Sequence, residues 1–143
     1  MVDTCSILDV GEIAEAVELQ LGSSDSMMFV RNTMYLEGHY WFRYRGLFVH
    51  VEPLGTSKYT LHTFGVSRDS LKDKIRFFVN IGKYLFDNTN CKDLIIFVPE
   101  ENLPLRLLIS KLSPNPTAYL EGSKEYVYVF NRGYLGCHKQ YLS

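Results

Sequence analysis

The sequence lacks any apolar run long enough to cross a membrane. No stretch approaches the roughly 18 consecutive apolar residues that a membrane-spanning helix requires. The first ten residues, MVDTCSILDV, contain neither a basic segment nor a long apolar segment, and both are typical of a secretion signal. We therefore expect neither a membrane partner nor a cleaved signal peptide.

Cysteine is also scarce. The three cysteines, Cys5, Cys91 and Cys137, are odd in number and far apart. This pattern favours reduced thiols in a cytoplasmic compartment over a disulfide framework. Cys137 and His138 are adjacent, but no second Cys/His pair accompanies them, so no metal site is expected. Cys91 has no neighbouring His to activate it, which favours an inert thiol over a nucleophile.

The chain has no excess of charge of one sign. It carries 15 basic and 16 acidic residues, a formal net charge of −1. A protein that binds nucleic acid mainly through phosphates needs a basic surface, so nucleic acid is not expected as a partner. The densest basic pair, Arg43 and Arg45, alternates along a predicted strand and should lie on one solvated face.

What is present indicates a globular α/β protein. Hydrophobic residues make up 46% of the 143 positions and aromatic residues 14%, proportions that can build a core. No linker or repeat divides the chain, so we predict a single domain over residues 1–143. Its expected parts are residues 1–65, residues 66–130 and a tail, 131–143. The aromatic run at 40–44 is interpreted as packing within the sheet.

The first part shows a helix followed by strands. Asp9 is positioned to cap a helix over residues 10–21, and Gly22 is positioned to end it. Residues 27–30 fit either a helix or a strand. Alternating patterns then predict strands at 40–45, 47–51 and 59–64, with a turn at residues 53–57. Three sequential strands with short turns predict an antiparallel meander.

The second part changes to helical spacing. Apolar residues from Leu71 to Phe86 recur on one face of a long helix, which Ser67 or Ser70 could cap. The apolar run 94–98 predicts a strand buried on both faces. Asn102 can cap another helix through Leu112. Residues 118–120 and 125–130 predict a closing hairpin, and the tail from residue 131 is expected to be irregular.

This order of elements, and the segment from "KYTLHTFGVSRDS" to "LLISKL" (58–112), resemble the GNAT (Gcn5-related N-acetyltransferase) fold. In "DLIIFVPEEN", Asn102 stands where that family starts a helix after the buried strand. The resemblance implies a mixed, mostly antiparallel central sheet with a splayed parallel strand pair, flanked by helices. His62 and "VPEEN" look most like GNAT-like proteins of tailed bacteriophages, some of which are head-assembly or internal virion components.

The resemblance also implies where a cofactor would bind. In the family, acetyl-CoA enters between the two parallel strands and rests its pyrophosphate on the start of the long helix. Arg68 matches the family pattern there, but Leu71 and Asp73 stand at its glycine positions. In the next helix Leu105 replaces a small residue, and Ile109 replaces the tyrosine that protonates the leaving thiolate.

These departures favour a degenerate active site. The expected function is a non-catalytic GNAT-fold phage protein, a structural, head-assembly or virion component that binds other phage proteins and no cofactor. It would reside in the host cytoplasm or the virion. The alternative is an active N-acetyltransferase using acetyl-CoA, and a host-directed binding module also stays open.

For an active enzyme, the sequence offers specific residues. His62 and Glu52 are the candidate catalytic bases, although His62 also fits a strand histidine with a hydrogen-bond partner. Arg68 and Asn102 are the candidate cofactor-binding residues. Tyr84 and Tyr128 could replace the missing acid, and both also fit core or sheet positions.

Overall fold

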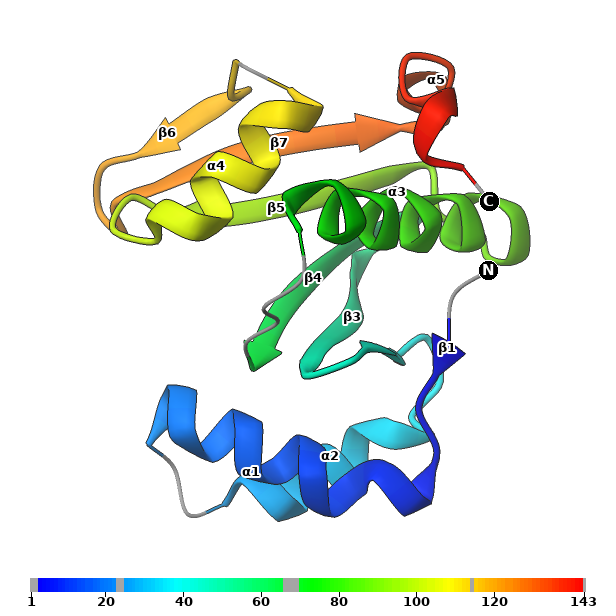
Figure 1. Ribbon diagram of the computed structural model, residues 1–143, viewed down its shortest axis with the longest axis vertical. Coiled ribbons are helices and arrows are strands. Elements are labelled where there is room, and N and C mark those ends of the chain that lie inside the picture. Colours follow the sequence, from blue (N-terminus) through cyan, green and yellow to red (C-terminus); the bar gives the residue numbers. More distant parts are fainter. Residues whose placement is uncertain (1–2, 23–24, 66–69, 114, 143) are drawn as a thin grey trace. The chain divides into compact units, whose positions relative to one another are not determined.

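A computed structural model describes residues 3–22, 25–65, 70–113 and 115–142 (Figure 1). The contacts divide the chain into two compact units, which are described separately. Unit 1 comprises residues 1–53 and 61–68, and unit 2 comprises residues 54–60 and 69–143. Arg68 and Ser67 lie outside the described residues, so the cofactor role predicted for Arg68 stays a prediction.

Unit 1 contains a pair of helices and the first strands. Its elements are β1 (Asp3–Thr4), η1 (Ile7–Asp9), α1 (Val10–Leu21), α2 (Ser26–Met34), β2 (Tyr40–Tyr44), most of β3 (Leu47–Gly55) and the second half of β4 (Lys58–Gly65). The helix over 10–21 is confirmed, and it ends at Gly22 in the left-handed conformation (φ 68°). The undecided segment 27–30 is helical and belongs to α2, which lies against α1.

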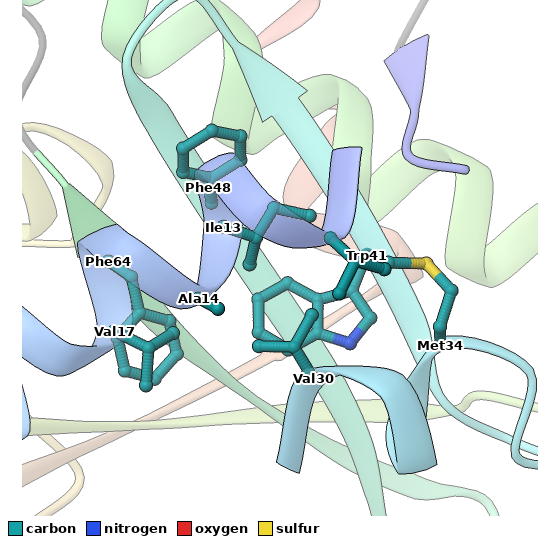
Figure 2. Close-up of a cluster of buried hydrophobic side chains, with 9 residues drawn as sticks. Ile13, Ala14, Val17, Val30, Met34, Trp41, Phe48 and Phe64 are labelled. Atoms are coloured by element: carbon teal, nitrogen blue, oxygen red, sulfur yellow. The ribbon is translucent and has the colours of Figure 1, made fainter. Parts of the chain in front are cut away.

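The core of unit 1 joins both helices to the sheet. Figure 2 shows side chains from α1 and α2 gathered around the indole of Trp41, with Phe48 and Phe64 contributed by β3 and β4. Ile13 and Val30 are completely buried and Trp41 is 2% exposed. Burying an apolar side chain of this size stabilises the fold by about 1.5–3 kcal/mol. The aromatic run at 40–44 therefore serves packing, as predicted.

Two local predictions about α1 and β2 are wrong in detail. Asp9 stands at the N-cap position, but its side chain does not cap the helix. Its carboxylate accepts a hydrogen bond from the amide of Ser6 (2.8 Å) and forms an ion pair with Arg43 (2.6 Å). Arg43 is therefore not on a solvated face: its side chain is 30% exposed and lies over the ring of Phe48. The reason is that Arg43 shares a strand face with the buried Trp41.

Unit 2 contains the longer helices and the closing strands. Its elements are the start of β4, α3 (Leu71–Asn88), β5 (Asp93–Pro99), α4 (Leu103–Leu112), β6 (Ala118–Leu120), β7 (Glu125–Asn131), α5 (Arg132–Leu135) and η2 (Lys139–Tyr141). α3 buries the apolar face that its spacing predicts, and the side chain of Ser70 caps it. The predicted closing hairpin is confirmed as β6 and β7.

The tail beyond residue 131 was expected to be irregular, but it forms α5 and η2. Contacts with α3 hold it. Arg132 pairs with Asp87 (2.7 Å) and also donates to the carbonyl of Phe86. The amide of Asn80 donates to the carbonyl of Tyr141 (2.9 Å). A four-residue helix has too little helical hydrogen bonding to persist by itself, so these tertiary contacts account for it.

The strands are hydrogen-bonded in the order β1-β2-β3-β4-β5-β7-β6. β4 and β5 are parallel, whereas the pairs β1–β2, β2–β3, β5–β7 and β6–β7 are antiparallel. This topology confirms the predicted fold class, a mixed and mostly antiparallel sheet flanked by helices. Among the helices described, none has the length and apolar character to span a bilayer.

Candidate functional site

The two candidate bases form a pair in unit 1. His62 Nε2 lies 2.8 Å from Glu52 Oε1. The side chains are 46% and 34% exposed, so both are accessible to a ligand. No other hydrogen bond of His62 is found within the described part of the chain, which leaves Nδ1 able to exchange a proton. With Nε2–H donating to the carboxylate, the imidazole is oriented and Nδ1 carries the lone pair.

Two further histidines adjoin this pair. His50 and Glu52 are two residues apart on β3 and share a strand face. His39, which precedes β2, places Nδ1 3.0 Å from Nε2 of His50. The His50 and His62 rings are 6.1 Å apart. The sequence reasoning missed His39 and His50, although the two-residue spacing of His50 and Glu52 was a usable signal.

His50 is completely buried in an aromatic surround. The Trp41 ring stacks on it at 4.6 Å, and Phe29 of α2 meets it edge-on at 5.4 Å. The pKa of His50 is lowered to about 4, mainly by burial; Glu52 opposes this shift, and the neighbouring His39 and His62 contribute to it. The ring is therefore neutral at pH 7. Its Nδ1 has no hydrogen-bond partner among the described atoms.

Trp41 is held in place by α2. Its Nε1–H donates to the hydroxyl of Thr33 (3.0 Å), which in turn donates to the carbonyl of Phe29 (2.8 Å). Trp41 also stands directly opposite His50 in the β2–β3 ladder. The indole therefore has a fixed position, and it fixes one face of the His50 ring.

Unit 2 contains the backbone features that a GNAT cofactor would use. The parallel ladder between β4 and β5 covers three pairs and ends at Thr60 and Ile95, whereas the ladder between β5 and β7 continues to Pro99. Within the described chain, β5 residues from 96 onward pair with β7 but not with β4. The backbone groups on the β4 side of this segment need hydrogen-bond partners, which a ligand could supply.

A buried hydroxyl lies at the end of this ladder. Thr60 is 2% exposed, and its Oγ1 has no hydrogen-bond partner among the atoms described. An unsatisfied buried polar group costs about 1–3 kcal/mol. A ligand that supplied a partner would recover that cost. Thr60 was not predicted as a site residue, because an orphaned hydroxyl is visible only in the folded chain.

The start of α3 fits a phosphate better than the sequence predicts. The amides of Leu71 and Lys72 precede the first intrahelical hydrogen bond. The Asp73 carboxylate, whose charge repels an anion, accepts from the Ser70 hydroxyl (2.9 Å) and lies 3.7 Å from Arg76. These contacts partly compensate its charge. The residues present therefore fit a CoA-type group at the helix start and along the edge of β5.

α4 agrees with the departures noted in the sequence. Asn102 caps it by accepting from the amide of Leu105 (3.2 Å), so its side chain has a structural role. Ile109 is completely buried and offers no proton. Tyr128 of β7, one of the candidate acids, is 7% exposed and lines a hollow of about 430 Å³ beside α4, together with Arg106.

The described cysteines do not form a reactive centre. Burial raises the pKa of Cys91 to about 11 and that of Cys5 to about 12, with nearby carboxylates adding to both shifts. Both thiols are therefore protonated at neutral pH. The sequence-based interpretation of Cys91 as inert agrees with this environment.

No protein family and no curated protein matches the sequence, but solved structures match the fold. FdhC, a nucleotide-linked sugar GNAT, is 10% identical, with a TM-score of 0.77 over 98% of this chain and 91% of its own. Spermidine N-acetyltransferase from Vibrio cholerae in complex with CoA and spermine is 11% identical, with a TM-score of 0.71 over 94% and 97%. Aminoglycoside 6′-acetyltransferase type Ii is 11% identical, with a TM-score of 0.70 over 90% and 94%.

At these identities the likeness shows the fold, which is the GNAT fold. The expectation that the chain uses no cofactor is wrong: the neighbours are acetyltransferases, one of them bound to CoA, and they point to acetyl-CoA. That expectation was based on the side chains of Leu71, Asp73 and Ile109. The features that fit the cofactor, the open edge of β5 and the start of α3, belong mainly to the backbone.

Proposed function

We propose that this chain is an N-acetyltransferase that moves the acetyl group of acetyl-CoA to an amine, with His62 as general base and Glu52 as the residue that orients it. The pairing of His62 with Glu52 at 2.8 Å, on a GNAT fold, is the observation that carries the proposal. Acetyl-CoA would supply an activated acetyl thioester. The comparisons favour this activity over the non-catalytic role that the sequence suggested.

The chemistry of the pair suits amine acetylation. An amine is protonated at neutral pH and must lose a proton before it can attack a carbonyl. His62 Nδ1 is the atom that would accept this proton. Glu52, hydrogen-bonded to Nε2, keeps the ring in the tautomer whose Nδ1 is unprotonated and stabilises the imidazolium that forms.

The charge of unit 1 suits a cationic amine. The sequence of unit 1 contains eight acidic and four basic side chains, and the exposed face of α1 carries Glu12, Glu15 and Glu18. This acidic excess, in the unit that holds His62 and Glu52, attracts a cationic amine.

Residues of unit 2 would hold the cofactor. The amides of Leu71 and Lys72 face the position of a phosphate at the start of α3, where the helix dipole favours an anion. The edge of β5 beyond Ile95 offers backbone hydrogen bonds, and the hydroxyl of Thr60 offers one more. Arg68, which belongs to unit 1, stays a predicted phosphate ligand on the sequence pattern alone.

The test is release of CoA thiol from acetyl-CoA in the presence of a panel of amines, including polyamines and amino sugars. Replacing His62 by Gln removes the base, and we expect kcat to fall by about 10²–10⁴-fold with little change in the KM for acetyl-CoA. His138→Gln, a histidine of unit 2 that bonds the carbonyl of Leu112, is the matched control and should retain wild-type kcat. A His62→Gln variant with wild-type kcat would contradict the role of the pair.

A non-catalytic phage protein, serving in head assembly or in the virion, is the second candidate. The observation in its favour is Ile109, which is fully buried where active relatives carry a proton-donating tyrosine. This role predicts that the protein co-sediments with phage particles or their structural proteins from infected cells. Recovery of free protein alone would count against it.

A further inference from the structure

We propose that His39, His50 and Glu52 form a binding site for a divalent transition-metal ion of the Zn²⁺ type. Each residue offers one ligand atom, and these atoms all lie within 4.8 Å of one another. The proposal does not rest on acetyl transfer. His39 and His50 are eleven residues apart and Glu52 follows on β3, a spacing unlike that of local zinc motifs. Motif spacing therefore does not predict the complete set of ligands.

The distances suit a first-row metal. Two imidazole nitrogens bound to tetrahedral Zn²⁺ at about 2.0 Å lie roughly 3.3 Å apart. His39 Nδ1 and His50 Nε2 are 3.0 Å apart, so small side-chain shifts would admit the ion between them. Two histidines and one glutamate leave a fourth position open, the arrangement found in catalytic rather than structural zinc sites.

The surroundings hold one ligand in place. His50 is completely buried. Its ring is clamped between Trp41 and Phe29. Without an ion, the contact between His39 and His50 must be bridged by one proton, since two facing lone pairs repel. A divalent cation would accept both lone pairs, and Glu52 would add negative charge.

His62 would not bind the metal ion itself. It contacts Glu52 at 2.8 Å and would act as the outer partner that orients the carboxylate. The two proposals therefore make separate demands on the residues. Base catalysis needs His62 and Glu52, whereas the metal needs His39, His50 and Glu52.

The experiment titrates chelator-treated, full-length protein with Zn²⁺ in a calorimeter and with Co²⁺ in a visible spectrometer. We expect one equivalent to bind, with the intense visible absorption of tetrahedral Co²⁺. His39→Ala and Glu52→Gln each remove a ligand and should weaken Zn²⁺ binding by more than about 100-fold. His62→Gln changes only the residue that orients Glu52 and should weaken binding by about 10-fold. His39 is preferred to His50 for substitution because it is only half-buried.

The controls address binding elsewhere on the chain. Cys137→Ser and His138→Ala remove the adjacent Cys/His pair, which is exposed at Cys137, and both should bind Zn²⁺ as the unaltered chain does. Circular dichroism establishes that each variant is folded. The proposal is overturned if Zn²⁺ fails to bind, if His39→Ala binds it with unchanged affinity, or if the Cys137 and His138 variants lose it. Loss of catalysis in His62→Gln, with Zn²⁺ binding weakened only about 10-fold, separates the two proposals.

Discussion

The hydrogen bond between Trp41 and Thr33 gives a stability prediction that can be worked out from the structure. Thr33→Val keeps the shape of the side chain but removes the acceptor of the indole N–H. Trp41 is 2% exposed and Thr33 7%, so the N–H would be left buried without a partner. That loss costs about 1–3 kcal/mol. Helix propensity adds little, because Thr and Val are both β-branched and rank close together.

The assay is urea unfolding. Trp41 is the single tryptophan of the chain, so its fluorescence reports on unit 1. With a slope of about 1–3 kcal/mol per M of urea, the midpoint should fall by about 1 M. Thr33→Ser keeps the hydroxyl and serves as the control, with a cost near that of one buried methyl group, about 0.8 kcal/mol.

A double-mutant cycle with Trp41→Phe, followed by circular dichroism, isolates the bond. Phe has no N–H to leave unpaired, so Thr33→Val should cost less in the Trp41→Phe background, by about 0.5–3 kcal/mol. Equal costs in both backgrounds would show that the hydroxyl of Thr33 does not hold the indole.

Two further predictions concern backbone and thiols. Gly65 has φ 86°, and a Cβ there would run into the carbonyl oxygen of Gly46, so Gly65→Ala should destabilise the protein by more than about 1–2 kcal/mol in urea unfolding. Gly11→Ala on α1, where a Cβ meets no atom within 4 Å, should be neutral or stabilising, and equal effects at the two sites would contradict this account. The pKa of Cys91 is raised to about 11 and that of Cys5 to about 12. At pH 8 only about one Cys91 thiol in 10³ and one Cys5 thiol in 10⁴ is therefore ionised. Iodoacetamide should modify the exposed Cys137 first, which mass spectrometry can measure. Equal modification of all three cysteines in the folded protein would be the contrary result, whereas equal modification in urea is expected.

Elements with local signals could be predicted from the sequence. α3 and α4 have apolar faces at helical spacing and capping residues, Ser70 and Asn102, next to their first turns. These signals act over a few residues and do not depend on distant contacts. Asp9 shows the limit of local signals, since its carboxylate, which was predicted to cap α1, pairs with Arg43, far along the sequence.

α5 could not be predicted for a related reason. Its four residues are too few to show periodicity, and ties to α3, such as the pairing of Arg132 with Asp87, hold it. Such contacts become visible only when the chain is folded.

The candidate site was predictable in part. His62, on a predicted strand, and Glu52, next to the end of another, could each be named as a titratable residue, but their pairing depends on how β3 and β4 align. His39 and His50 come together because of strand register, with His50 opposite Trp41 in the β2–β3 ladder. The available edge of β5 is likewise a property of where a ladder ends, and side-chain identities do not reveal it.

Binding of acetyl-CoA is the direct test of the proposal that this chain is an acetyltransferase. Thermal unfolding is recorded with and without acetyl-CoA at about a hundredfold excess over its Kd, with AMP at the same concentration as the control. A ligand at this excess stabilises the folded state by about 2.7 kcal/mol, which raises Tm by several degrees. The account predicts such a rise with acetyl-CoA and a much smaller one with AMP. An unchanged Tm at millimolar acetyl-CoA would contradict it.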